Sequence, residues 1–373
     1  MQARGSSSGL FAQATFLVQT DWVQFGFSRD HTHFNNFENV LKPTNVSNLV
    51  LDWSYTAGRD IVSSPAVVNG VVYVGSHDDK LYAFNAATGM LLWSYATAGP
   101  VLSSPAVANG VVYIGSSDHT LYALNATTGA FLWSYTTGLF IESPPLVING
   151  MVYVGSDDHK LYAFNATTGT LLWTYTTNGD IGFSSPTIAN GVVYVCSEGD
   201  TLYALNATRG TLLWSYTAGD EMDSSPVIAN GVVYADSKDD KLYAFNATTG
   251  ALLWSYTTGG QMTSAPAVAN GVVYAGSQDG NLYALNATTG AFLWSYTTSL
   301  IGSSSAAVAN GVVYIGSVGN YTLYALNATT GAFLWSYTTG NTIGSSPAVA
   351  NGVVYVGSSD HTLYAFHLPG TTP

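Results

Sequence analysis

The chain has 373 residues, of which 47% are hydrophobic and 8% are charged, and its formal net charge is −13. This composition is too apolar for a disordered chain, and its acidic balance excludes a basic surface for nucleic acid. No apolar run approaches the roughly 18 residues of a membrane-spanning helix, so the apolar side chains predict a large buried core.

Residues 1–42 precede the repetitive part of the chain, and we interpret them as a leader. Within it, residues 1–20 carry one arginine and a broken apolar stretch, which makes a poor signal peptide. We expect this part to be disordered, a remnant of an export signal or an added segment. His31 and His33 are expected to pack or to face solvent rather than to bind a metal.

A repeat of about forty residues fills residues 43–373, which we interpret as a single domain. Eight tryptophans are spaced by 40 or 41 residues, and eight Asn-Gly pairs keep the same period. The tryptophans are Trp53, Trp93, Trp133, Trp173, Trp214, Trp254, Trp294 and Trp335. A four-stranded propeller blade and a helical repeat pair both suit such a period.

The unit at 103–136, "SSPAVANGVVYIGSSDHTLYALNATTGAFLWSYT", decides between these two repeats. β-Branched and aromatic residues dominate it, and Asn109-Gly110 between apolar runs indicates a tight hairpin. The unit predicts strands "PAVA", "VVYIGS", "LYALN" and "AFLWSYT" joined by three turns. Eight such units predict an all-β, eight-bladed propeller, with each tryptophan packed between neighbouring blades.

The two ends of the repeat region complement each other. Residues 49–56 have the sequence of an outer strand with no inner strands before them, whereas the last unit, 344–366, has three inner strands and no tryptophan. We expect the N-terminal strand to complete the eighth blade and so to close the ring.

Ala83, Asn85, Thr88, Gly89 and Trp93 spell A-x-N-x-x-T-G-x-x-x-W, a motif that returns from six further alanines. It resembles the tryptophan-docking motif of the pyrroloquinoline-quinone (PQQ) propeller family, which contains quinoprotein alcohol dehydrogenases and non-enzymatic relatives. The resemblance implies the same propeller fold. The dehydrogenases use adjacent cysteines against the quinone, whereas this chain has only Cys196, so the resemblance favours the non-enzymatic branch.

The units differ most where one blade joins the next. The connections from each outer strand to the next innermost strand are expected to ring one mouth of the central channel, where propellers usually bind ligands. The candidate ligand-binding residues there are Arg59, Asp60, Glu142, Asp180, Asp220, Glu221, Asp223, Gln261 and Asn341. Glu142 and Asp223 are candidates for holding a cation or a polar ligand; the alternative is that all nine are solvated loop residues.

Other motifs give weaker signals. Asp118-His119, Asp158-His159 and Asp360-His361 lie on turns of different blades, so they are not expected to converge on a metal. The inner-strand serines are expected to line a polar channel without acting as nucleophiles. Six Asn-Ala-Thr sequences match the N-glycosylation signal, and we interpret them as by-products of the turn unless the protein is exported and glycosylated.

The leading hypothesis is therefore a non-enzymatic binding propeller that needs no cofactor and offers one rim and the funnel to a protein or a small polar ligand. A second hypothesis is a minimal PQQ- and calcium-dependent oxidoreductase that uses acids such as Glu142 and Asp223. A third is an envelope-assembly scaffold similar to the propeller lipoprotein of the outer-membrane barrel-assembly machinery. We expect a secreted, periplasmic or cell-surface monomer with a tendency to domain swapping, because similar blades can mispair.

Overall fold

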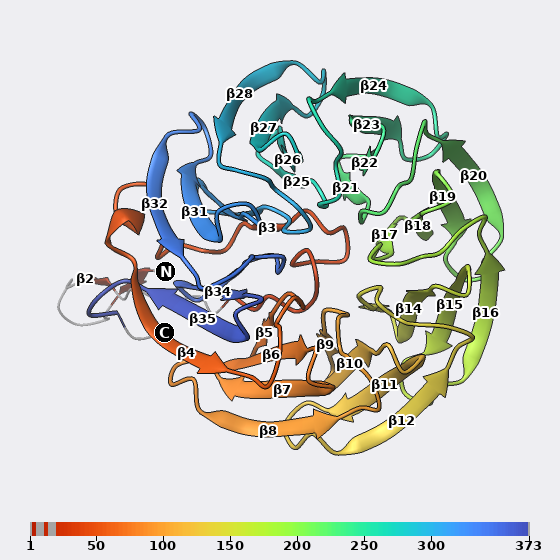
Figure 1. The fold of residues 1–373 in the computed structure, drawn as a ribbon, viewed down its shortest axis with the longest axis horizontal. Coiled ribbons are helices and arrows are strands. Elements are labelled where there is room, and N and C mark those ends of the chain that lie inside the picture. Colours follow the sequence, from red (N-terminus) through yellow and green to blue (C-terminus); the bar gives the residue numbers. More distant parts are fainter. Residues whose placement is uncertain (1, 5–10, 14–19, 372–373) are drawn as a thin grey trace.

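The computed structural model describes residues 2–4, 11–13 and 20–371. Eight antiparallel four-stranded sheets surround a central axis like the blades of a propeller (Figure 1), so the predicted fold is confirmed. The one helical element in these ranges is the 3-10 turn η1 (Val46–Asn48). No helix of the described residues has the length and apolarity to cross a membrane.

Each blade contributes an innermost, a second, a third and an outer strand, and blade 1 begins with β5. The innermost strands are β5 (Ala66–Val68), β9 (Ala106–Ala108), β13 (Leu146–Ile148), β17 (Thr187–Ala189), β21 (Val227–Ala229), β25 (Ala267–Ala269), β29 (Ala307–Ala309) and β33 (Ala348–Ala350). The second strands are β6 (Val71–Ser76), β10 (Val111–Gly115), β14 (Met151–Ser156), β18 (Val192–Ser197), β22 (Val232–Ser237), β26 (Val272–Gly276), β30 (Val312–Gly316) and β34 (Val353–Gly357).

The third strands are β7 (Lys80–Asn85), β11 (Thr120–Asn125), β15 (Lys160–Asn165), β19 (Thr201–Asn206), β23 (Lys241–Asn246), β27 (Asn281–Asn286), β31 (Thr322–Asn327) and β35 (Thr362–His367). The outer strands are β8 (Leu91–Ala96), β12 (Phe131–Thr136), β16 (Leu171–Thr176), β20 (Leu212–Thr217), β24 (Leu252–Thr257), β28 (Phe292–Thr297), β32 (Phe333–Thr338) and β4 (Val50–Thr56). Outside the blades, β1 (Gln2–Arg4) pairs with β2 (Phe11–Gln13), and β3 (Phe34–Asn35) adds to blade 7 alongside β29.

The Asn-Gly pairs form the turns between innermost and second strands. Asn109 and Gly110 have φ angles of 51° and 76°, and Ala108 pairs with Val111 across the turn. Positive φ at both central residues is what a type I′ hairpin requires, and asparagine and glycine adopt it at the lowest cost. The same pair recurs at this turn in every blade.

The ring closes as the sequence predicts. The outer strand of blade 8 is β4, which pairs antiparallel with β35, so that Trp53 lies opposite Ala365 and Thr56 opposite Thr362 (Figure 1). Both strands thereby gain a hydrogen-bonded neighbour that neither would have in an open chain.

An indole joins each blade to the next, and all eight repeat tryptophans make such a contact. Trp133 Nε1 donates to the carbonyl of Ala166 in the next blade at 3.0 Å, and the same carbonyl accepts a second bond from the Tyr113 hydroxyl, also at 3.0 Å. The indole lies against Gly169, whose φ of 70° and lack of a side chain allow the contact. Seven of the eight junctions have this paired bond to one alanine carbonyl.

The junction between blades 7 and 8 differs from the other seven. Trp335 Nε1 donates to the carbonyl of Leu49, just before the closing strand β4, at 3.0 Å. The hydroxyl of Tyr314, which corresponds to Tyr113, is buried and has no hydrogen-bond partner among the described residues. This junction therefore depends on one hydrogen bond where the others have two.

The leader, residues 20–42, runs through the central channel and crosses the middle of the ring in Figure 1. It meets all eight innermost strands in turn, each at the middle residue of the strand. Six blades use backbone bonds, such as Val107 N–H to Val23 O at 2.8 Å and Val308 N–H to His33 O at 2.7 Å. Blades 3 and 8 use the side chains of Gln24 and Asn35. The leader therefore closes the channel at the end that carries the Asn-Gly turns.

His31 and His33 lie in this closed part of the channel and are fully buried. Their rings pack edge-on against Phe25, with centroids 5.9 and 4.9 Å away. None of their four ring nitrogens has a hydrogen-bond partner within the described ranges. Burial lowers the pKa of both side chains to about 3, and the neighbouring His33 adds to the effect on His31.

Candidate functional site: an acidic cup at the open mouth of the channel

Above the leader, the channel widens into a cup of about 700 Å³ that opens on the opposite face. Its walls come from the blade connections and from the turns between second and third strands, and Phe25 of the leader lies at its floor. The lining is Phe25, Val62, Ser64, His77, Leu102, Ser104, Glu142, Pro144, Phe183, Asp223, Ser224, Ser225, Lys238, Gln261, Thr263, Ala265, Gln278, Leu300, Gly302, Ser303, Ser305, Val318, Gly344 and Ser346. Apolar side chains and serine hydroxyls dominate this surface.

The structure brings three of the nine candidate residues into the cup: Glu142, Asp223 and Gln261. The other six, Arg59, Asp60, Asp180, Asp220, Glu221 and Asn341, lie in the connections but not in the lining. Two of these six pair with turn histidines: Asp60 contacts His361 at 3.1 Å, and Asp180 contacts His159 at 3.3 Å. Those contacts engage two of the three turn histidines, His159 and His361, and the described residues contain no group of three side chains suited to a metal.

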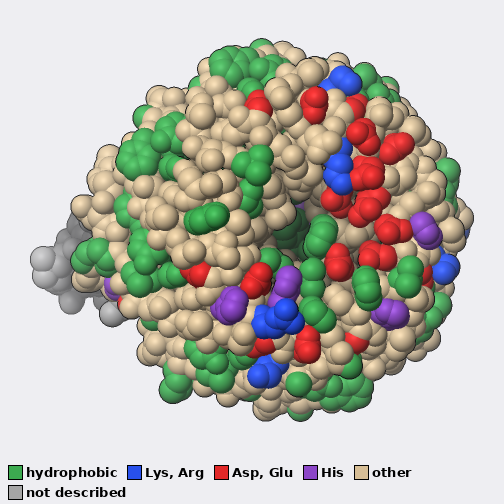
Figure 2. Space-filling model, viewed as in Figure 1, with side chains coloured by type: hydrophobic (Ala, Val, Ile, Leu, Met, Phe, Trp, Pro, Cys, Tyr) green, Lys and Arg blue, Asp and Glu red, His purple; other side chains and the backbone are tan. Residues whose placement is uncertain are grey.

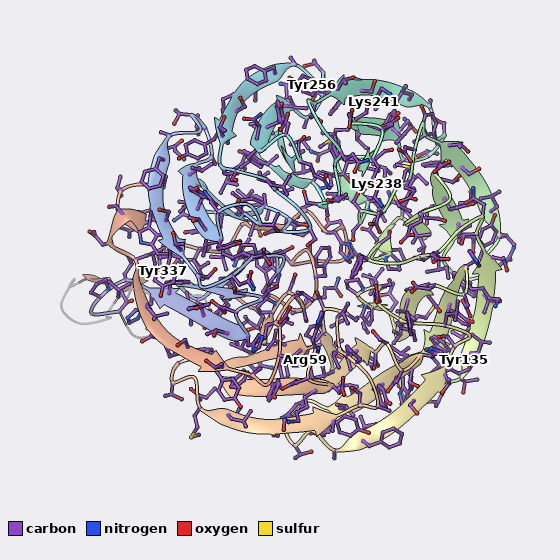
Figure 3. All side chains as sticks on the ribbon, in the orientation of Figure 1. Arg59, Tyr135, Lys238, Lys241, Tyr256 and Tyr337 are labelled. Atoms are coloured by element: carbon purple, nitrogen blue, oxygen red, sulfur yellow. The ribbon has the colours of Figure 1, made fainter. Side chains whose placement is uncertain are left out.

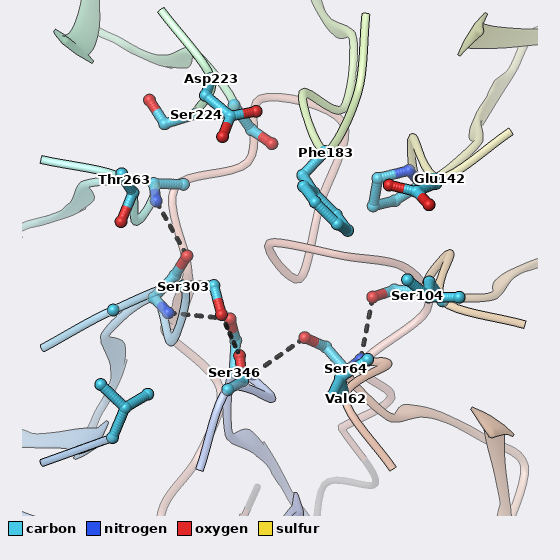
Figure 4. A pocket seen from close by; sticks show the side chains of 18 of the residues that line it. Val62, Ser64, Ser104, Glu142, Phe183, Asp223, Ser224, Thr263, Ser303 and Ser346 are labelled. Atoms are coloured by element: carbon cyan, nitrogen blue, oxygen red, sulfur yellow. Dashed lines mark hydrogen bonds between the residues drawn. The ribbon is translucent and has the colours of Figure 1, made fainter. Parts of the chain in front are cut away.

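Three residues of the cup lining were not identified from the sequences of the blade connections: Phe25, Phe183 and Lys238. Phe183 lies beside Glu142 on the wall (Figure 4) and is 46% exposed, unlike most large apolar side chains of the core. The signal for it is present in the sequence, because its connection, "NGDIGFSSP", is one residue longer than that of the preceding blade. Lys238 comes from a turn between second and third strands, and Figure 3 places it closer to the channel than Lys241.

Carboxylates gather on one side of the cup, over blades 3 to 5 (Figure 2). We call this cluster the acidic sector; its interacting members are Glu142, Asp157, Asp180, Glu198, Glu221 and Asp223. Burial, with repulsion from Glu142 and other acids, raises the pKa of Asp157 to about 7. Burial, with repulsion chiefly from Asp223, raises the pKa of Glu198 to about 7. Lys238 offsets part of this charge by pairing with Glu221 and, at 3.7 Å, with Asp223. The sector therefore holds more negative charge than the protein itself neutralises.

This repulsion predicts a pH dependence of stability. Because the pKa of Glu198 is higher in the folded than in the unfolded state, the contribution of Glu198 to the free energy of unfolding falls as pH rises from about 4 to 7. Glu198→Gln is expected to raise the melting temperature at pH 8 by roughly 1–2 °C, since a half-exposed charge contributes less than about 1 kcal/mol. At pH 4 the variant and the wild type should melt together. Asp79→Asn, in the equivalent turn of blade 1, should leave the melting temperature unchanged at both pH values. A higher melting temperature of Glu198→Gln at pH 4 as well as at pH 8 would contradict the electrostatic cause.

One buried acid lies behind the wall of this sector. Asp236, in β22, occupies a position that is glycine in six blades and Cys196 in blade 4. In those six blades a β carbon would collide with an isoleucine or valine of the next blade, such as Ile141 against Gly115. The facing residue of the next blade is methionine only opposite Cys196 and Asp236, where it is Met222 and Met262. An unbranched methionine leaves room for the side chain that replaces glycine.

The carboxyl of Asp236 is fully buried, and one of its oxygens bonds the hydroxyl of Ser224, which lines the cup. Burial raises its pKa well above the usual range, because the charged form would be removed from water.

Serines form a ring of hydrogen bonds around the cup. The Ser346 N–H donates to Ser64 Oγ, and the Ser64 N–H donates to Ser104 Oγ, each at 2.9 Å (Figure 4). Ser305 and Ser225 extend the pattern to other blades. The hydroxyls serve as acceptors within the wall, and no histidine or carboxylate activates one as a nucleophile among these bonds. The cup can therefore enclose a ligand.

Comparison with known proteins agrees with this architecture. The family model described as outer membrane protein assembly factor BamB matches six overlapping stretches, residues 50–145, 103–188, 141–228, 179–300, 222–320 and 297–371. No curated protein matches the chain.

Three solved structures illustrate the likeness in fold. BamB from Moraxella catarrhalis has a TM-score of 0.76 at 20% identity over 86% of this chain and 99% of that one. A europium-containing methanol dehydrogenase has a TM-score of 0.82 at 16% identity over 94% and 98% of the two chains. The computationally designed Ika8 protein has a TM-score of 0.76 at 19% identity over 84% and 97%. At these identities the likeness concerns the fold alone. The family match, in contrast, spans the whole ring, and the chain belongs to the BamB-like family of PQQ-type propeller repeats.

Proposed function

We propose that this protein is a non-enzymatic binding propeller that takes up its ligand, a protein segment or a small polar molecule, at the open mouth of the cup. The observation that carries the proposal is the leader, because it bonds the innermost strands at the other end of the channel, so that within the described residues the cup opens at the mouth formed by the blade connections. That opening is also where the blades differ most in sequence, while their strands are nearly identical. Variation confined to one mouth of a uniform scaffold is typical of a binding site.

A protein partner outside the cytoplasm is the occupant that the family favours, since its model describes an outer membrane protein assembly factor. We propose a secreted, periplasmic or cell-surface location on the same ground. The acidic sector then provides charge for a basic segment of the partner, and Phe183 beside Glu142 provides an exposed apolar contact.

A pull-down from the source organism tests this proposal. The triple variant Glu142→Gln/Phe183→Ala/Asp223→Asn is expected to retain its partner at least about tenfold more weakly than the wild type, a difference of roughly 1.4 kcal/mol. The matched control, Ala87→Gln/Met90→Gln, changes two exposed residues on the opposite rim, in the blade 1 turn that has no Asn-Ala-Thr sequence, and should retain the partner fully. Equal loss in both variants, or no loss in the triple variant, would contradict binding at the cup.

A second candidate is a PQQ- and calcium-dependent oxidoreductase, which the methanol dehydrogenase fold suggests. The residues of the cup fit an anionic quinone poorly: Glu142 and Asp223 repel it, and Lys238, the one lysine or arginine of the lining, is engaged by Glu221. Incubation with PQQ and Ca²⁺, followed by dye reduction with alcohols or aldose sugars, separates the two candidates. Sustained turnover would establish the enzyme and overturn the binding proposal.

A further inference from the structure

The rim opposite the cup carries seven copies of one turn between third and outer strands. Antiparallel strands place this turn at the end of the blade that also holds the Asn-Gly hairpins, and a bond from Ala126 N–H to Gly110 O joins the two turns. In six blades the turn begins with Asn-Ala-Thr, the acceptor sequence for N-glycosylation in exported proteins. The six asparagines are Asn125, Asn165, Asn206, Asn246, Asn286 and Asn327.

The geometry of the turn leaves the amide nitrogen of each asparagine free. Asn125 Oδ1 accepts the backbone N–H groups of Thr127 and Thr128, at 3.0 and 2.9 Å, and the other five copies repeat both bonds. These bonds fix the side chain by its oxygen. The six Nδ2 atoms make no hydrogen bond with a described residue and are absent from the buried atoms that lack a partner, so they reach solvent.

The threonine two residues after each asparagine is not needed for the turn. Thr127 is exposed, and its hydroxyl bonds to no described residue, as in the other five copies. The seventh copy, in blade 1, has Ala87 at this position, yet Asn85 Oδ1 still accepts the N–H groups of Ala87 and Thr88, at 3.1 and 2.9 Å. Alanine thus supports the same turn, so the fold does not use the threonine hydroxyl. The hydroxyl remains available for N-glycosylation, whose acceptor sequence requires it.

Exposed apolar side chains lie directly beside these turns. The Asn125 N–H bonds to Ala130 O, and the next two residues, Phe131 and Leu132, are 52% and 47% exposed. Every blade repeats this apolar belt, and Asp52 is the one charged residue of the outer strands. The belt consists of Val50, Leu51, Met90, Leu91, Leu92, Phe131, Leu132, Leu171, Leu172, Leu212, Leu213, Leu252, Leu253, Phe292, Leu293 and Phe333.

Such a belt is a liability for a free protein in water. Contiguous exposed apolar surface promotes association, and outer strands without charged residues or proline present unpaired backbone groups to other chains. A bulky hydrophilic group attached at each turn would cover the apolar pair of its own blade.

We propose that the six Asn-Ala-Thr turns are N-glycosylation sites and that their glycans shield the apolar belt. In the reaction, a bond forms between asparagine Nδ2 and the anomeric carbon of an oligosaccharide carried on a lipid phosphate. The bond from that carbon to the phosphate oxygen breaks, the lipid phosphate leaves with the electron pair, and the amide loses one proton. The glycans occupy the rim away from the cup, so they leave its mouth open. The inference depends on the proposed export but not on what the cup binds.

Peptide mapping of the protein purified from its source tests the sites. Release of N-glycans by an amidase in H₂¹⁸O is expected to leave ¹⁸O-labelled aspartate at the six positions and none at Asn85. A folded, exported protein that is unmodified at all six would overturn the proposal. A pull-down through the cup can succeed or fail independently of this result, so the two proposals fail separately.

Matched variants, secreted from a eukaryotic cell line, test the sites one by one. Ala87→Thr is expected to add a seventh glycan at Asn85, and Thr127→Ala to remove the glycan at Asn125 alone. Enzymatic removal of all glycans should increase light scattering and the fluorescence of a hydrophobic dye several-fold at constant melting temperature. Unchanged scattering and dye fluorescence would overturn the shielding role.

Discussion

Trp335→Ala is expected to lower the free energy of unfolding by about 3 kcal/mol, the lower end of the cost of removing a large aromatic side chain, because this indole is half-buried. The change removes the Trp335–Leu49 hydrogen bond at the one junction where the corresponding tyrosine, Tyr314, contributes none. It therefore weakens the ring where the two ends of the chain meet. Urea unfolding followed by circular dichroism measures the loss.

Two conservative variants separate the hydrogen bonds of the junctions from their packing. Tyr113→Phe breaks the bond to the Ala166 carbonyl and is expected to cost about 1 kcal/mol. Tyr314→Phe removes a buried hydroxyl that has no partner within the described ranges, so it should be neutral or stabilising. Equal losses in the two variants would show that the junction between blades 7 and 8 is built like the others.

The fold was predictable because its determinants are local and recur eight times. Each Asn-Gly pair specifies a hairpin through its backbone conformation, and each tryptophan marks an outer strand that docks on the next blade. An error in one unit would have been visible against seven copies. Even the closure of the ring followed from counting strands at the two ends, as the pairing of β4 with β35 confirms.

The cup was predictable only in part, because the leader that forms its floor has no repeat and no periodic pattern. It binds the innermost strands mainly through its backbone, as at Val23 and Thr32, and backbone bonds leave little trace in the sequence. The position of Phe25 in the floor follows from this path, not from any motif. Comparison of the copies with one another would, however, have revealed the paired exceptions Cys196 with Met222 and Asp236 with Met262.

The leader should leave the channel in acid because of its two buried histidines. In the folded protein the pKa of His31 and His33 is about 3, below the value of about 6.5 in an unfolded chain, so the folded state binds fewer protons. Their neutral forms favour folding fully above pH 6.5, and this contribution is lost as pH falls toward 3. For the pair we expect a loss on the order of 5 kcal/mol, with faster hydrogen exchange at the Val107 and Val308 amides that bond the leader.

The double variant His31→Leu/His33→Leu isolates this effect, because leucine has a similar volume and takes up no proton. Both positions have a φ of 52°, which leucine adopts less readily than histidine, and this cost opposes the gain from removing four ring nitrogens that lack partners among the described residues. The change of stability with pH, and not its value at pH 7, is therefore the test. Between pH 7 and 4 two carboxylates of the acidic sector act in the opposite direction: protonation of Asp157 and Glu198 relieves their repulsion and stabilises the fold. The melting temperature of the variant is therefore expected to rise slightly over this range while that of the wild type falls. Parallel curves for the two proteins would show that the acid sensitivity arises elsewhere than in the channel.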